Sequence, residues 1–290
     1  MHTEETNPAS GNIDTLSLTD IIRIMDEENQ CVVDAVKSAG DSIERIISDV
    51  VRTIKSGGSL IYIGAGTSGR LGVLDASEMP PTFGVSSNIV RGIIAGGEKA
   101  LTEAVEGAED DEAAGISAIA GIRSGDLLLG ISASGKTPFT ISALREGKRR
   151  GTVCWLMECN DAEYDFLDGI IKLPVGPEIV AGSTRLKAGT ATKMVLNMIS
   201  TAAMIKLGKV YKGYMIDVIP SNIKLKNRAK RIIQEITGCR MEETEELLNK
   251  SGGNAKTAVL MYMKKLSQVE AVSLLESSDG LLRNALENGR

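Results

Sequence analysis

Residues 60–84 read LIYIGAGTSGRLGVLDASEMPPTFG, an apolar run followed by a Gly/Ser/Thr turn and a mostly apolar stretch. The run at 60–63 is rich in β-forming residues and predicts a buried strand. Three glycines within 64–69 let the backbone turn sharply, so that free N–H groups and the hydroxyls of Thr67 and Ser68 converge. A helix that begins there adds its positive end. The stretch therefore predicts an anion-binding turn between a strand and a helix.

A second stretch of this kind lies at residues 126–137, DLLLGISASGKT. The run at 127–131 predicts another buried strand. The turn that follows it carries Ser132, Ser134, Lys136 and Thr137. Two such turns can hold one phosphorylated ligand between them.

Each turn also matches a nucleotide-binding pattern, GxGxxG in the first and GxxxxGK[ST] in the second. The dinucleotide interpretation requires an acid about 20 residues after the glycines. That region reads SSNIVRG and has none. The nucleoside triphosphatase interpretation requires a later strand that ends in a magnesium-binding Asp. Asp161 is separated from the run at 153–157 by three residues, which is poor spacing for that role. The triphosphatase interpretation therefore remains only an alternative.

Composition limits the class of protein. The chain has 290 residues, 42% of them hydrophobic, which allows one large or two modest domains with a real core. No apolar run approaches the ~20 residues that span a bilayer, and the first residues do not resemble a signal peptide, so we expect no membrane contact and a cytoplasmic location. The net charge of −5 and the 3% of aromatic residues argue against nucleic-acid binding. Four cysteines without close pairing predict reduced thiols.

The single histidine is His2, in a polar segment that we expect to be disordered. Its place excludes catalytic triads and metal centres built on histidine. Proton transfer must therefore be performed by carboxylates, lysines or tyrosines.

Strands alternate with helices through the middle of the chain, which predicts an α/β fold whose parallel sheet is covered on both faces. The expected strands are 60–63, 89–94, 127–131, 152–157 and 169–173, and the expected helices are 66–78, 98–121, 137–150 and 184–207. For the last helix we expect Ser183 or Thr184 as the N-cap and an end at Gly208. The predicted domains are an N-terminal helical segment (1–50), a ligand-binding domain (51–219) and a C-terminal helical region (220–290).

Two groups of carboxylates follow the first turn. Helical spacing places Glu78 on one face with Leu71 and Leu74, and Pro80 is expected to end the helix shortly afterwards. A sheltered general acid and a solvent-facing glutamate both remain compatible with this spacing. The second group, EGAEDDE at 106–112, reads most simply as a solvated helix face, and periodicity does not select one acid among its members.

These motifs resemble one enzyme family. GAGTSGRLGVLDASEMPPTFG at 64–84, EGAEDD at 106–111, SASGKTP at 132–138 and GSTRLKAGTATKMVLNMIS at 182–200 resemble the N-acetylmuramic acid 6-phosphate etherases. The resemblance extends over residues 15–290. This family belongs to the sugar isomerase (SIS) fold group and is similar to the glucokinase regulatory protein, which binds phosphosugars without etherase chemistry.

The resemblance implies a homodimer of three-layer α/β subunits with the site at or near the interface, and a small C-terminal helical region similar to ubiquitin-associated domains. It implies cleavage of a D-lactyl ether with Glu109 as base and Glu78 as acid, and it implies no metal or nucleotide cofactor. The implied phosphate-binding residues are Thr67, Ser68, Ser132, Ser134, Lys136 and Thr137. Arg70, Arg185 and Lys187 are further candidates for substrate contact, or for structural ion pairs.

One distance complicates this assignment. A continuous helix separates Ser68 from Glu78 by about 15 Å, more than one sugar spans. Either the helix is shorter or bends near Gly72, or Glu78 completes the neighbouring subunit's site, which we favour. A phosphosugar sensor, a phosphosugar isomerase and a nucleotidase remain the alternative functions.

Overall fold

The computed structural model describes residues 2–218, 220 and 223–287. Its contacts divide the chain into two compact units. The first unit comprises Met1–Ser77 and Ser87–Ser200, and the second comprises Glu78–Ser86 and Thr201–Arg290. Each unit has its own hydrophobic core.

A parallel five-stranded sheet forms the centre of the first unit, in the order β2-β1-β3-β4-β5. The strands are β1 (Leu60–Gly64), β2 (Val90–Ile94), β3 (Leu127–Ile131), β4 (Val153–Glu158) and β5 (Gly169–Lys172). β1 and β3 are buried along their whole length, as their uninterrupted apolar runs predict. The α/β fold class and all five strands expected from the sequence are thereby confirmed.

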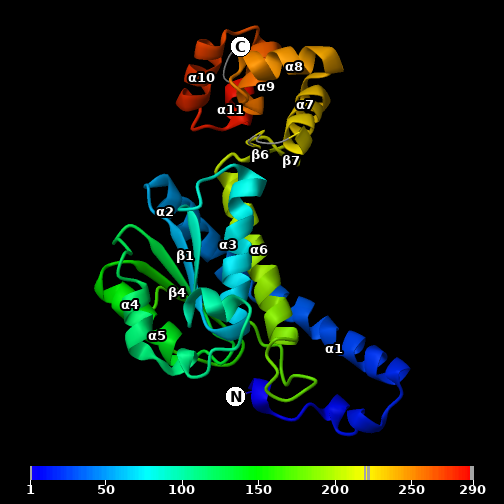
Figure 1. The fold of residues 1–290 in the computed structure, drawn as a ribbon, viewed down its shortest axis with the longest axis vertical. Coiled ribbons are helices and arrows are strands. Elements are labelled where there is room, and N and C mark those ends of the chain that lie inside the picture. The colour runs from blue at the N-terminus through cyan, green and yellow to red at the C-terminus, as the bar shows by residue number, and fades with distance from the viewer. Residues whose placement is uncertain (1, 219, 221–222, 288–290) are drawn as a thin grey trace. The chain divides into compact units, whose positions relative to one another are not determined.

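Helices cover both faces of this sheet (Figure 1). The helices are α1 (Leu18–Ser38), α2 (Gly40–Lys55), α3 (Gly66–Phe83), α4 (Glu112–Ala118), α5 (Pro138–Arg149) and α6 (Lys187–Lys206). Alternate strand residues such as Ile61 and Leu128 pack in one cluster with Leu144 of α5. The side chains of Tyr62 and Trp155 point to the other face. The Tyr62 hydroxyl donates a hydrogen bond to Asp75 of α3, and the Trp155 indole N–H donates one to Asp49 of α2. The unit therefore has three layers.

Two expected helices differ in the structure. α3 continues through Pro80 and Pro81 to Phe83, where the sequence predicted an end before the prolines. Each proline lacks the N–H that would bond four residues back, and its ring crowds that carbonyl. The helix nevertheless continues, and its last turn closes on Gly84, whose N–H donates to the carbonyl of Pro80 at 3.0 Å. The helix expected over 98–121 is mostly absent as well. That segment forms two 3-10 turns, Gly97–Leu101 and Ala108–Asp110, before the short α4.

The N-terminus of α6 is capped by a residue that the sequence did not suggest. The carboxylate of Glu178 accepts the backbone N–H groups of Lys187 at 3.0 Å and Ala188 at 2.9 Å. The expectation of Ser183 or Thr184 as N-cap was wrong, because one carboxylate satisfies two N–H groups that a single hydroxyl cannot. Glu178 is fully buried, so both bonds are shielded from water.

The N-terminal segment is ordered, contrary to the expectation for His2. It forms 3-10 turns at His2–Glu4, Pro8–Ser10 and Ile13–Thr15. Thr3 is buried and meets Asn160, whose side-chain amide donates to the Thr3 hydroxyl at 3.2 Å. Polar residues thus hold this segment to the first unit through hydrogen bonds that composition does not reveal.

The second unit contains the hairpin β6 (Val210–Tyr211) and β7 (Tyr214–Met215) and five helices, α7 (Ile223–Thr237), α8 (Met241–Lys250), α9 (Ala255–Lys264), α10 (Gln268–Ser277) and α11 (Leu282–Glu287). α9 contacts the other four helices, and its first six residues are all buried. Lys256 of α9 is paired with Asp217 at 3.0 Å. In the part of the chain that the structure describes, every helix is too short or too polar to cross a lipid bilayer.

The Glu178 cap gives the first test. Glu178→Ala leaves two N–H groups of α6 unsatisfied and is expected to lower the free energy of unfolding of the first unit by about 3 kcal/mol. Trp155, the single tryptophan, lies buried in β4 and reports this unit's unfolding in urea. The exposed Glu163 provides the control, since Glu163→Ala is expected to change stability by less than about 0.5 kcal/mol. Equal effects of the two substitutions would contradict the capping role.

Candidate active site

Two turns meet at the carboxyl edge of the sheet, where ligands of open α/β sheets bind. β1 and β3 are adjacent, and Gly64 at the end of β1 is in register with Ile131 at the end of β3. The first cradle, residues 64–69, and the second cradle, residues 132–137, therefore begin side by side. The structure brings together the two turns that the sequence identified separately.

The first cradle depends on close backbone packing. A Cβ atom at Gly64 would lie 2.8 Å from the carbonyl oxygen of Ile131, and one at Gly69 would lie 2.6 Å from that of Gly64. Side chains at these positions would push apart the two strands and the start of α3. Thr67 and Ser68 lie in the first turn of α3, half-buried, where helix N–H groups and the helix dipole favour an anion.

The second cradle is a hydrogen-bonded loop. The Ser132 hydroxyl lies 2.8 Å from that of Thr137 and 3.2 Å from that of Ser134. Ser134 accepts the backbone N–H of Lys136 at 3.2 Å, and the Lys136 side chain is exposed. Three hydroxyl groups are thus gathered directly before α5, which begins at Pro138.

The two glutamates lie on different elements. Glu109 belongs to the 3-10 turn Ala108–Asp110, which packs against α5, and it is exposed. Glu78 lies within α3 and is also exposed. Leu74, on the same face of α3, is 51% exposed, so this face is not sheltered within one chain. Because α3 runs unbroken past Ser68 and Glu78, the shorter helix considered above is excluded.

Two of the three other basic candidates, Arg70 and Lys187, make structural contacts. Arg70 donates to the backbone carbonyls of Leu101 at 3.2 Å and Glu103 at 2.9 Å, which ties the first cradle to the segment after β2. The Lys187 side chain is 4% exposed and pairs with Glu28 at 2.6 Å. These contacts favour a structural role for both residues. Arg185 is exposed beside the start of α6.

The structure adds Glu158, which sequence reasoning did not consider for the site. Glu158 is the last residue of β4 and is 1% exposed. Burial raises its pKa to about 7, against the opposing effect of backbone hydrogen bonds from Asn160 and Ala162. An acid that directly follows a buried run in a parallel sheet was the signal available in the sequence.

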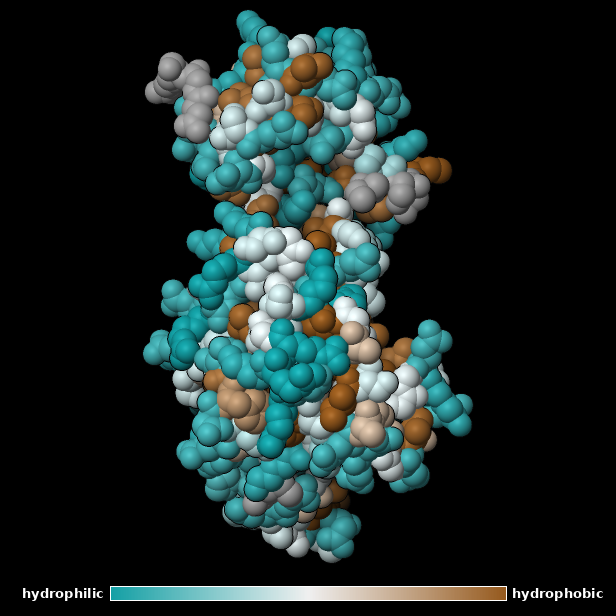
Figure 2. Space-filling model, turned by 90° about the vertical axis from the view of Figure 1, so that its left-hand side faces the viewer, coloured by the Kyte–Doolittle hydropathy of each residue, from teal (hydrophilic) through white to brown (hydrophobic). Residues whose placement is uncertain are grey.

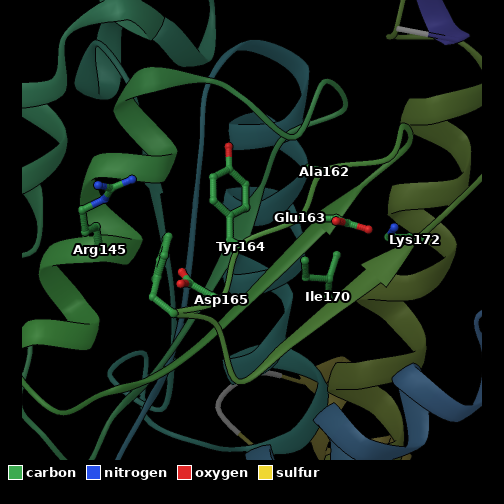
Figure 3. A pocket seen from close by; sticks show the side chains of 8 residues that line it. Arg145, Ala162, Glu163, Tyr164, Asp165, Ile170 and Lys172 are labelled. Carbon is green, nitrogen blue, oxygen red and sulfur yellow. The ribbon is translucent and has the colours of Figure 1, made fainter.

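A groove of about 850 Å³ lies beside this edge. Figure 3 shows Arg145 of α5 on one side of it, Lys172 of β5 on the other and Tyr164 between them. Among the residues that the structure describes, no group of three or more His, Cys, Asp and Glu side chains is placed to hold a metal ion.

Comparison with known proteins defines the class of this fold and then the family. Residues 42–148 match the glucokinase regulatory protein N-terminal SIS domain, and β1, β2, β3 and both cradles lie within the matched residues. A solved structure, phosphoheptose isomerase from Neisseria gonorrhoeae, aligns at 16% identity with a TM-score of 0.47 over 64% of this chain and 98% of that one.

Relatives over the whole chain are more similar. The N-acetylmuramic acid 6-phosphate etherase of Geobacillus thermodenitrificans is 46% identical over 98% of both chains. The protein of that name from Klebsiella aerogenes is 46% identical over 99% of this chain and 97% of its own. The etherase 1 of Bacillus licheniformis reaches 48% over 98% and 95%. The chain belongs to the N-acetylmuramic acid 6-phosphate etherase family.

Gly135 gives a test of the second cradle. It has φ +70°, and a Cβ atom there would lie 2.6 Å from that of Ala162. Gly57 has φ +82° with open space around it. Gly57→Ala is therefore expected to cost about 1 kcal/mol of stability from backbone strain alone. Gly135→Ala is expected to cost about 2 kcal/mol more, because the loop or Ala162 must move. Urea unfolding measures both, and equal losses would contradict the close packing beneath the cradle.

Proposed function

We propose that this protein is a carbon–oxygen lyase that cleaves the D-lactyl ether of N-acetylmuramic acid 6-phosphate to N-acetylglucosamine 6-phosphate and D-lactate. The observation that carries the proposal is the pair of adjacent cradles at one sheet edge, in a chain that belongs to the etherase family. The proposed phosphate-binding residues are Thr67, Ser68, Ser132, Ser134, Lys136 and Thr137. Glu78 and Glu109 are the proposed catalytic residues.

The first half of the reaction is an elimination. Opening of the sugar ring produces an aldehyde at C1, which acidifies the hydrogen on C2. Glu109 takes that proton, the C2–H electrons form a C2–C3 double bond, and the bond from C3 to the lactyl oxygen breaks. Glu78 gives its proton to this oxygen, so lactate leaves as an alcohol and not as an alkoxide.

The second half is an addition of water. Glu78, now ionised, takes a proton from the water molecule while the oxygen of that water bonds to C3. The electrons of the double bond return to C2, which receives a proton from Glu109. Both glutamates regain their starting protonation states, and all atoms are accounted for without an oxidant or a metal ion.

The alternative functions differ in measurable products. A phosphosugar sensor would release nothing, and the presence of both Glu78 and Glu109 argues against it. An isomerase would use a base at C2 but would release no lactate. A nucleotidase would be stabilised by ATP and magnesium, whereas the proposed enzyme is stabilised by phosphosugars in a thermal-shift comparison.

A coupled D-lactate assay tests the activity and the catalytic pair together. Purified protein is expected to release D-lactate from N-acetylmuramic acid 6-phosphate. Glu78→Gln and Glu109→Gln are each expected to lower kcat by about 10²–10⁴-fold, the usual contribution of one proton transfer. Glu106→Gln, in the same acidic segment, is the control and should retain full activity. Unimpaired catalytic variants would refute the site assignment.

We also propose a homodimer in which Glu78 serves the site of the partner subunit. Exposed apolar side chains on α1 support it, since Leu18 is 78% exposed, Ile22 68% and Val33 53%. These residues recur at helical spacing and form one stripe that a second copy would cover. The face of the first unit that carries α4 and α5 is largely hydrophilic by contrast (Figure 2).

Mixed subunits test the shared site. Glu78→Ala and Ser134→Ala subunits are each expected to be inactive as homodimers. Mixing them creates heterodimers in which one of the two sites has an intact cradle and an intact Glu78, so lactate release is expected to recover to about one quarter of wild type after random mixing. Mixing Glu78→Ala with Glu78→Gln subunits is the control and should restore nothing. No recovery in the first mixture would place Glu78 in its own subunit's site.

The remaining assignments belong to the same proposal. We assign the enzyme to the cytoplasm, on the composition of the chain, and to the recycling of peptidoglycan amino sugars, as the resemblance implies. The proposal also keeps the three predicted domains, namely a helical segment at 1–50, a phosphosugar-binding domain at 51–219 and a helical region at 220–290.

A further inference from the structure

A buried carboxyl group with an unsatisfied oxygen lies beneath the second cradle. Oε2 of Glu158 accepts the backbone N–H of Asn160 at 2.5 Å, and the backbone N–H of Ala162 also favours the charged form. Oε1 is buried and has no hydrogen-bond partner within the described part of the chain. An ionised carboxylate is poorly stabilised in such a place, because desolvation penalises the charge and only part of its acceptor capacity is used.

The end of β4 is tied to the second cradle by backbone and side-chain hydrogen bonds. Ser132 donates its N–H to the carbonyl of Met157 at 3.0 Å, and the carbonyl of Ala133 accepts the Cys159 N–H at 3.0 Å. The Asn160 side chain donates to the same carbonyl at 2.7 Å. These bonds hold the loop directly against the strand that ends in Glu158.

Gly135 brings the cradle within contact of the carboxyl group. A Cβ atom at Gly135 would lie 3.4 Å from both Cβ and Oε2 of Glu158. On the other side of the loop, the Tyr164 hydroxyl donates to the Gly135 carbonyl at 3.0 Å. The loop that presents Ser134, Lys136 and Thr137 therefore has little room to move away from Glu158.

The charged and titratable groups around Glu158 do not neutralise it. Lys172 of β5 is in register with Glu158, and its charge lowers the pKa of Glu158. Its amino group is 3.6 Å from the carboxylate of Asp161 and its side chain is 41% exposed, so it does not outweigh burial. Asp161 repels a charge on Glu158. Burial is the main cause that raises the pKa of the Cys159 thiol to about 12 and also raises the pKa of Tyr164, so both groups stay neutral near pH 7. The charge of Arg145, on α5, opposes this effect by lowering the pKa of Tyr164.

We propose that Glu158 is a positioning residue that links one proton to phosphate binding in the second cradle: neutral Glu158 permits a dianionic phosphate above Gly135, and ionised Glu158 repels it. This inference rests on the proposed function, since it takes the second cradle to be the phosphate site. The ligand class is a phosphate monoester, and N-acetylglucosamine 6-phosphate serves as the probe because it is the proposed product.

The direction of the pH effect follows from the acid. Glu158 becomes charged as pH rises through about 7, so affinity in the wild-type protein falls over that range. If a bound dianion raises the pKa of Glu158 by one unit, affinity drops about fivefold between pH 6 and pH 8 relative to a protein without this acid.

Calorimetric titration of N-acetylglucosamine 6-phosphate at pH 6, 7 and 8 tests the link. The ratio of Kd for wild type to Kd for Glu158→Gln is expected to rise about fivefold from pH 6 to pH 8. The phosphate's own second ionisation, with pKa near 6, cancels in this ratio. Asp165→Asn removes an exposed carboxylate from the segment between β4 and β5, and the ratio of its Kd to that of wild type should not change with pH. A merely structural role for Glu158 would change affinity equally at every pH.

A second measurement uses the wild-type protein alone, in case Glu158→Gln does not fold. At pH 8 the phosphate is already a dianion, so any proton taken up from the buffer on binding must go to the protein. Titrations in buffers of different ionisation enthalpy are expected to show uptake of about 0.4 proton per site. Binding without proton uptake, or a Kd ratio that does not change with pH, overturns the role of Glu158 but does not contradict the phosphate site. Absence of binding at every pH overturns both proposals.

Discussion

The site depends on close backbone packing at Gly64, the last residue of β1, and at Gly69, in the first turn of α3. Gly64 lies against the carbonyl of Ile131, and Gly69 lies against the carbonyl of Gly64, at distances that leave no room for a Cβ atom. Only this packing lets α3 begin beside the end of β3. As a result the two cradles begin side by side at the sheet edge, where we propose that their hydroxyl and N–H groups hold one phosphate.

The proposed catalytic residues lie on other elements than the proposed binding residues. The cradles are tightly packed turns at the edge of the sheet. The proposed acid and base are exposed side chains elsewhere, Glu78 on α3 and Glu109 on a 3-10 turn. Exposed carboxylates gain the shielding that proton transfer benefits from only when substrate or a second subunit covers them. Glu158 differs because the fold itself buries it, and its proton is therefore linked to whatever charge the second cradle holds.

Much of the fold could be predicted from the sequence, because continuous apolar runs indicate buried parallel strands and glycines indicate the turns that follow them. The course of 98–121 could not, since its helical propensity is overridden by turns at Gly96 and Gly107, both with positive φ. The cap by Glu178 and the burial of Glu158 are tertiary effects that local spacing does not contain. The domain boundaries and the residues of the site stay predictions, because the roles of Glu78 and Glu109 come from the resemblance and their exposure in one chain does not decide them.

A structure of the protein with bound N-acetylglucosamine 6-phosphate tests the central claim most directly, namely that the two cradles form one phosphate site. The account predicts phosphate oxygens within about 3 Å of hydroxyl or N–H groups from both cradles, including Ser134 and Ser68. A phosphate held in the groove between Arg145 and Lys172, or by one cradle alone, would contradict it.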